Sequence, residues 1–159
     1  MFWLYVCSLI VVGVEMNKNK EKALKQQVMQ LTQGKQYQAA SVIAKKLAKN
    51  NPKDIEVWYA LAQLQTQIGE YENAVRSYYQ VCQGPSHVYV QAVQRAVEIS
   101  IEFGFWRLGI APAKELINIR PSSAEAHYSL GLCWYRVNNQ LKERACLQRT
   151  IGLEPSHVD

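Results

Sequence analysis

The side chains of this 159-residue chain that could bind a metal are its cysteines and histidines. They are Cys7, Cys82, Cys133, Cys146, His87, His127 and His157. No two cysteines form a C-x-x-C pair, and the histidines do not supply the clustered ligands that a zinc site needs. We therefore expect free thiols in a reducing compartment, and no bound metal or other cofactor.

Catalytic chemistry has equally little support in the sequence. No G-x-S-x-G, P-loop, H-E-x-x-H or G-x-G-x-x-G motif occurs. Glu98, Glu102 and Glu125 are expected to approach one another on one surface, but no neighbouring residue suggests acid–base work. His127 lies on a helical face and is interpreted as structural. We expect neither an enzyme nor a small-molecule substrate.

A repeat of about 34 residues must position these side chains. Its markers are Pro52, Pro85, Pro121 and Pro155, which stand 33, 36 and 34 residues apart. The tetrapeptide PSHV occurs at two of these prolines. Each proline follows an apolar helical pattern, and proline ends helices. The spacing therefore predicts similar helical units in tandem.

The unit between Pro52 and Pro85 shows two amphipathic helical faces. They consist of Trp58, Leu61, Ala62 and Gln65, and, after a break at Gly69, of Tyr71, Ala74, Tyr78 and Val81. This pattern resembles the signature of the tetratricopeptide repeat (TPR) family, W-x2-L-G-x2-Y followed by A-x3-F and P. Trp58, Leu61, Ala74 and Tyr78 occupy matching positions.

The resemblance covers about residues 21–157 and implies an all-α helix-turn-helix solenoid of about four repeats. The expected repeats are residues 21–54, 55–89, 90–123 and 124–157, within a TPR domain of residues 21–159. The last unit departs from the signature at His127, where the family prefers Trp, and at Glu143, where it prefers Ala. Small residues are expected where two helices approach closely. They are Ala62, Ala74, Gly109 and Gly131.

A TPR solenoid binds protein segments on the face built from the first helix of each repeat. The register predicts a partner-binding groove formed by Lys25, Met29, Tyr59, Gln63, Gln94, Arg95, Tyr128 and Tyr135. Glutamine and tyrosine make adaptable hydrogen bonds and rigid aromatic contacts, which favours an extended segment of mixed polarity. A merely solvated helix face is the alternative.

One TPR subfamily binds the C-terminal carboxylate of heat-shock chaperones with a Lys-Asn-Asn-Lys-Arg clamp. Lys25 and Arg95 fit that clamp, whereas Met29, Ala60 and Gln91 stand where Asn, Asn and Lys should be. With two matches in five positions, we do not predict a chaperone-tail binder.

Two further surfaces are candidates for docking. Phe103, Phe105 and Trp106 cluster around Gly104 and form a second candidate patch, with a locally irregular core as the alternative. Pro112, in the helix that follows, is expected to delay or kink that helix. At the C-terminal edge, Leu147 and Ile151 are expected to be covered by a partner or by a second copy.

The N-terminal sequence MFWLYVCSLIVVGV is almost entirely apolar. It lacks the positive start of a secretory signal peptide and is short for a spanning helix, which needs about 20 residues. We interpret residues 1–16 as an uncleaved transmembrane anchor helix, with Trp3 and Tyr5 at one interface. The alternatives are a helix docked into a partner's membrane subunit and an unusual signal peptide.

Basic residues follow directly after this apolar segment. Residues 17–20 form a basic flank, and the stretch from Lys18 to Lys53 contains nine lysines and Glu21 as its one acid. The positive-inside rule places the repeats on the cytoplasmic or stromal side. An anionic membrane surface is the expected contact for this charge, and no motif suggests nucleic acid.

The layout of a short anchor, a basic flank and a few repeats is similar to that of small thylakoid-anchored TPR proteins that assist photosystem I assembly. This resemblance implies a membrane-anchored scaffold for assembly in photosynthesis. Its expected partners are protein subunits of a membrane complex. A permanent accessory subunit and a bacterial factor for cytochrome c maturation or envelope assembly are the alternatives.

Overall fold

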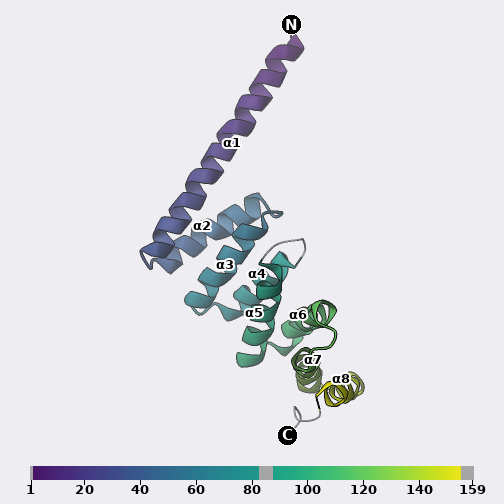
Figure 1. The fold of residues 1–159 in the computed structure, drawn as a ribbon. Helices are drawn as coiled ribbons and strands as arrows, with labels where there is room; N and C mark the ends of the chain where they lie inside the picture. Colours follow the sequence, from purple (N-terminus) through teal and green to yellow (C-terminus); the bar gives the residue numbers. More distant parts are fainter. Residues whose placement is uncertain (1, 83–87, 155–159) are drawn as a thin grey trace.

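The computed structural model describes the backbone of residues 2–82 and 88–154 and the side chains of residues 18–82 and 88–154. This described part contains eight α-helices and no strand (Figure 1). They are α1 (Phe2–Gln33), α2 (Tyr37–Asn50), α3 (Ile55–Gln67), α4 (Tyr71–Val81), α5 (Tyr89–Glu102), α6 (Trp106–Ile119), α7 (Ala124–Arg136) and α8 (Gln140–Leu153). The predicted all-α, TPR-like array of helix pairs is confirmed.

Each helix packs against the next one along the chain, and the pairs follow one another from the N-terminal to the C-terminal side (Figure 1). The first helices of the four pairs are α1, α3, α5 and α7, and the second helices are α2, α4, α6 and α8. Pro52 and Pro121 lie in the turns between pairs. Pro85 and Pro155 lie outside the described residues.

The turn inside each pair has the same backbone conformation in all four units. One residue takes a positive φ, two positions before the second helix: Lys35 (57°), Gly69 (79°), Gly104 (75°) and Asn138 (59°). The next residue donates its N–H to the carbonyl five positions earlier, as in Gln36 to Leu31 and Glu70 to Gln65. This is a Schellman ending of the first helix, which satisfies carbonyls that a helix end would otherwise leave unpaired.

Small residues lie where paired helices come closest, as the register predicts. Ala62 and Ala74 are fully buried in the core between α3, α4 and α5. A Cβ added at Gly109 would lie 2.8 Å from Ser100 Cβ, and one at Gly131 would lie 3.3 Å from Cys146 Cβ. Glycine therefore sets how closely α6 approaches α5 and α8 approaches α7.

Helix α1 is much longer than its partner α2. It runs without interruption through the expected anchor, the basic flank and the first helix of the first repeat. Its N-terminal half extends beyond the remaining helices (Figure 1). The three predicted segments are thus parts of one helix, and their boundaries at residues 16 and 20 stay predictions.

Helix α6 corrects one expectation. It begins at Trp106 and continues through Pro112, so the predicted delay was wrong. Proline removes one backbone donor from the helix. The buried face of Gly109, Pro112, Ala113 and Leu116 packs the ring into the core, which compensates for the missing hydrogen bond.

Candidate partner-binding groove

The surface formed by α1, α3, α5 and α7, here called the groove face, contains two pockets. The first pocket lies between α1, α2 and α3, and the second between α5, α6 and α7. Each therefore bridges two consecutive repeats. This placement follows from the stacking of helix pairs, which leaves a depression between successive first helices.

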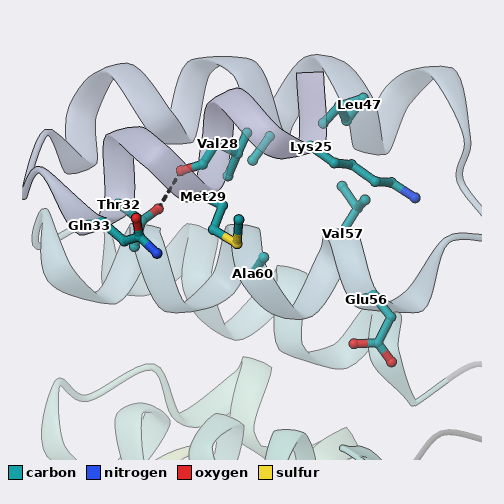
Figure 2. Close-up of a pocket in the computed structure, with 10 residues that line it drawn as sticks. Lys25, Val28, Met29, Thr32, Gln33, Leu47, Glu56, Val57 and Ala60 are labelled. Carbon is teal, nitrogen blue, oxygen red and sulfur yellow. Dashed lines mark hydrogen bonds between the residues drawn. The ribbon is translucent and has the colours of Figure 1, made fainter. Parts of the chain in front are cut away.

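The first pocket is apolar and has a volume of about 320 Å³. Its lining residues are Lys25, Val28, Met29, Thr32, Gln33, Ala44, Leu47, Glu56, Val57 and Ala60 (Figure 2). Val28, Leu47 and Val57 are buried core residues that form its floor. Met29 is 57% exposed and points from α1 toward Ala60 of α3 (Figure 2). A flexible thioether over an apolar floor suits an apolar side chain from a partner.

Lys25 is held in place at the edge of this pocket. Its Nζ lies 2.5 Å from Asp54 Oδ2 and 3.0 Å from Glu21 Oε1. The hydrogen bond to Asp54 raises the pKa of Lys25. Asp54 also accepts the N–H of Val57 at 3.3 Å and so caps α3. The ammonium group of Lys25 already has two carboxylate partners, which supports rejecting the chaperone-tail clamp.

In the middle of the groove face, the side chains contact their own repeat and the neighbouring one. The Tyr59 hydroxyl donates to Gln91 Oε1 at 3.2 Å, and its ring meets Tyr78 edge-on with centroids 5.8 Å apart. Arg95 Nη1 donates to Glu98 Oε2 at 2.6 Å. Gln63 is exposed on the same helix as Tyr59. These predicted groove residues line neither pocket.

The second pocket, of about 300 Å³, is polar and acidic. Gln94, the predicted groove residue of α5, lines it together with Glu98, Glu102 and Glu125. The three glutamates that the register places on the groove face thus line one pocket. Arg120 is the one cation in the lining. Arg95 pairs with Glu98, which leaves Glu102 and Glu125 against Arg120, and this small excess of carboxylates suits a basic side chain from a partner.

Tyr128 and Tyr135 stand on α7 beside the second pocket but do not line it. Both rings are exposed, and seven positions separate them, which puts them on one side of the helix. Glu125 and Ser129 of the same helix do line the pocket. The tyrosines therefore flank the acidic pocket at its C-terminal side.

The aromatic patch of the third unit has partners within the chain. Phe103 stacks on Tyr71 with centroids 3.6 Å apart, and Phe105 packs against the core of α3, α4 and α5. The Arg136 guanidinium lies 4.9 Å from the centre of the Trp106 ring. Phe103 is the most exposed of the three, at 39%. A docking role for the patch stays a prediction.

The last helix leaves apolar atoms at the surface. Ile151 is 47% exposed and Leu141 is 83% exposed, while Leu147 is half-buried against Gly131 of α7. Thr150 is its one buried residue. That a partner covers Leu147 and Ile151 stays a prediction.

The remaining candidate side chains are engaged in the core or in turns. Burial raises the pKa of the Cys82 thiol to about 12 and that of the Cys133 thiol to about 11, so both stay protonated near neutral pH. Cys7, His87 and His157 fall outside the described side chains. Within the residues that are described, no cluster of three or more His, Cys, Asp and Glu could hold a metal ion.

His127 replaces the signature tryptophan and makes the same contact. Its Nε2 lies 3.1 Å from the carbonyl oxygen of Pro121, and Trp58 Nε1 donates to the carbonyl oxygen of Pro52 at 2.9 Å. Both bonds join a first helix to the proline turn six residues earlier. A carbonyl oxygen can only accept, so His127 carries its proton on Nε2 in this contact.

Over residues 2–82 and 88–154, no helix combines the length and the apolar character needed to cross a bilayer. The transmembrane character expected for residues 1–16 stays a prediction. The apolar run of 14 residues, at 1.5 Å per residue, spans about 21 Å, less than the hydrocarbon core of about 30 Å.

Sequence reasoning missed the floor of the first pocket. The sequence analysis assigns no binding role to Val28, Ala44, Leu47 and Val57, because apolar spacing cannot show that one side of the core opens to solvent. The one signal in the sequence was Met29, an unbranched apolar residue among the polar positions of the groove.

Fold and groove together define a TPR-like helical repeat protein, the class of scaffold that binds other proteins. The chain belongs to the ChAPs family (Chs5p-Arf1p-binding proteins), whose family model matches residues 5–95, more than half of its length.

Solved structures of similar shape show the same fold. MamA (residues 41 to end) from Desulfovibrio magneticus RS-1 is 21% identical, with 87% of this chain and 77% of that chain covered and a TM-score of 0.55. MamA of strain AMB-1 is 11% identical, with 83% of this chain and 71% of that chain covered and a TM-score of 0.58. A comparison with curated protein sequences finds no match.

Proposed function

We propose that the chain is a protein-binding scaffold whose groove face binds an extended partner segment. One observation carries the proposal: an apolar pocket between the first two repeats, with the exposed Met29 above a floor of Val28, Leu47 and Val57. The acidic second pocket adds a requirement for a basic side chain in the partner segment. The favoured segment has an apolar side chain for the first pocket and a basic side chain for the second.

We further propose that residues 1–16 attach the scaffold to a membrane, with the repeats on the cytoplasmic or stromal side. The apolar sequence MFWLYVCSLIVVGV and the lysines that follow it support this attachment. Helix α1 would then carry the attachment segment and one wall of the first pocket on one continuous helix.

The process we propose is the assembly or stabilisation of a membrane protein complex. Photosystem I at the thylakoid membrane is the specific candidate, supported by the resemblance in layout. A permanent accessory subunit, and a factor for cytochrome c maturation or envelope assembly, are the competing assignments. The stoichiometry of the isolated complex separates a transient factor from a permanent subunit.

The family match supports a second set of partners. The family is described by binding to Chs5p and Arf1p, and its model covers the repeats that form the first pocket. Proteins of these two kinds are therefore candidates for the partner of the groove face.

The test is affinity purification of the tagged chain from detergent-solubilised membranes, with mass spectrometry of the co-purifying proteins. Met29→Glu places a charge over the apolar pocket and should reduce recovery of the partner about tenfold or more. Val42→Glu is the matched control, because Val42 is 65% exposed on α2 and lines no described pocket.

The parent chain and Val42→Glu should recover the same proteins in the same amounts. Equal recovery with Met29→Glu would exclude the first pocket as the binding site. A partner present in equal molar amount after stringent washing indicates a permanent subunit, whereas a small fraction indicates an assembly factor.

A further inference from the structure

The lysines of the first repeat come together around one level of α1. Lys20 of α1 and Lys46 of α2 line one shared pocket, together with Glu21, Leu24, Leu47 and Asn50. The fold thus places the C-terminal end of α2 next to the part of α1 that directly follows the apolar segment. Lysines far apart in sequence become neighbours on the surface.

We call this surface the lysine collar. Its exposed members are Lys18, Lys20, Lys22, Lys45, Lys46, Lys49 and Lys53. The nearby acids do little to offset this charge. Glu21, the one acid between Lys18 and Lys53, pairs with Lys25, and so does Asp54. The collar therefore has a strong local positive charge.

The geometry sets this charge close to the base of the apolar helix. Lys18 to Lys22 spans about 6 Å along α1 at 1.5 Å per residue, and Lys46 lies beside Lys20. The N-terminal half of α1 extends away from the other helices (Figure 1). If the N-terminal half of α1 entered a flat surface, that surface would lie against the collar.

We infer that the lysine collar binds the anionic headgroups of a bilayer, with α2 supplying half of the contact. The inference rests on the proposed membrane attachment and adds a requirement for anionic lipid. All collar residues are lysines, whose compact charge suits attraction to a charged surface rather than bidentate recognition of one group. The adjoining apolar segment favours a bilayer over a nucleic acid.

The experiment measures sedimentation of the full chain with vesicles of phosphatidylcholine alone and of phosphatidylcholine mixed with phosphatidylglycerol. The test variant combines Lys45→Gln, Lys46→Gln and Lys49→Gln. The matched control combines Arg107→Gln, Arg144→Gln and Arg149→Gln, which removes the same charge from exposed residues of α6 and α8. Thermal melting of both variants verifies that they are folded.

The parent chain should bind the mixed vesicles more tightly than the neutral ones, and added salt should remove the difference. Each lysine neutralised should weaken binding to the mixed vesicles up to about fivefold. The test variant should therefore lose up to about a hundredfold, and the control variant less than about twofold. Binding of both variants to neutral vesicles should equal that of the parent.

Each contrary result has a distinct meaning. A parent chain that binds neither kind of vesicle refutes the membrane attachment itself. Equal binding to both kinds refutes the collar while the attachment stands. Undiminished vesicle binding by the test variant, together with loss of binding to RNA added as a probe, would assign the collar to nucleic acid instead.

Discussion

At the scale of single residues, the turn inside each helix pair requires a left-handed residue. Gly69 and Gly104 adopt this conformation without strain, whereas Lys35 adopts it at φ 57° with a Cβ. For a residue other than glycine, this conformation costs about 1–2 kcal/mol. The backbone strain at Lys35 therefore lowers the stability of the first repeat.

Lys35→Gly should stabilise the chain by about 0.5–1 kcal/mol, the relief of strain less the extra entropy of glycine in the unfolded state. Asn138→Gly should gain less, because asparagine tolerates the left-handed region. Thermal or urea unfolding measures both. Lys45→Gly, at an exposed position in the middle of α2, is the control and should destabilise by about 1 kcal/mol. A destabilised Lys35→Gly would contradict the left-handed turn.

At the scale of helices, two glycines of similar sequence context have opposite roles. Gly109 faces Ser100 of α5 so closely that an added Cβ would stand 2.8 Å from Ser100 Cβ. Gly152, within α8, would have no atom within 4 Å of its added Cβ. Packing against α5 therefore determines the effect of a substitution at Gly109, whereas helix propensity determines it at Gly152.

Gly109→Ala should lower the free energy of unfolding by about 1–3 kcal/mol, because α5 and α6 must move apart. Gly152→Ala should raise it by up to about 1 kcal/mol, the usual gain of alanine over glycine within a helix. Chemical denaturation of the two variants in parallel tests the pair. A Gly109→Ala variant as stable as the parent would show that the two helices are farther apart.

The helices themselves were largely predictable, since proline spacing and apolar periodicity are local signals. The match of Trp58, Ala74 and Tyr78 to a repeat signature placed the helix pairs. The long continuous α1 was not anticipated, because the change from apolar to basic sequence suggested a boundary where the backbone has none. The sequence changes from apolar to polar and basic at residue 17, but the residues on both sides of this point form one helix.

The groove was predictable only in part. Lys25, Met29 and Gln94 line pockets, as the register implies, but Tyr59 and Arg95 bond to side chains of their own or the neighbouring repeat. Such pairings depend on side chains that meet across separate helices, which spacing along one helix does not reveal. The Lys25–Asp54 pair is of the same kind.

At the scale of the whole molecule, the array has two chemically distinct ends. The first repeat combines an apolar pocket with the lysine collar, and the third and fourth repeats share an acidic pocket. A partner segment along the groove face would meet these surfaces in order. This order fixes the direction of the segment, because its apolar and basic groups fit at different ends.

The most direct test of groove binding is photo-crosslinking from defined positions of the chain within native membranes. A diazirine analogue of methionine is placed at position 29 in one variant and at position 42 in another. Position 29 should cross-link a discrete partner protein, and position 42 should cross-link none. Cross-links from position 42 alone, or equal products from both positions, would contradict partner binding on the groove face.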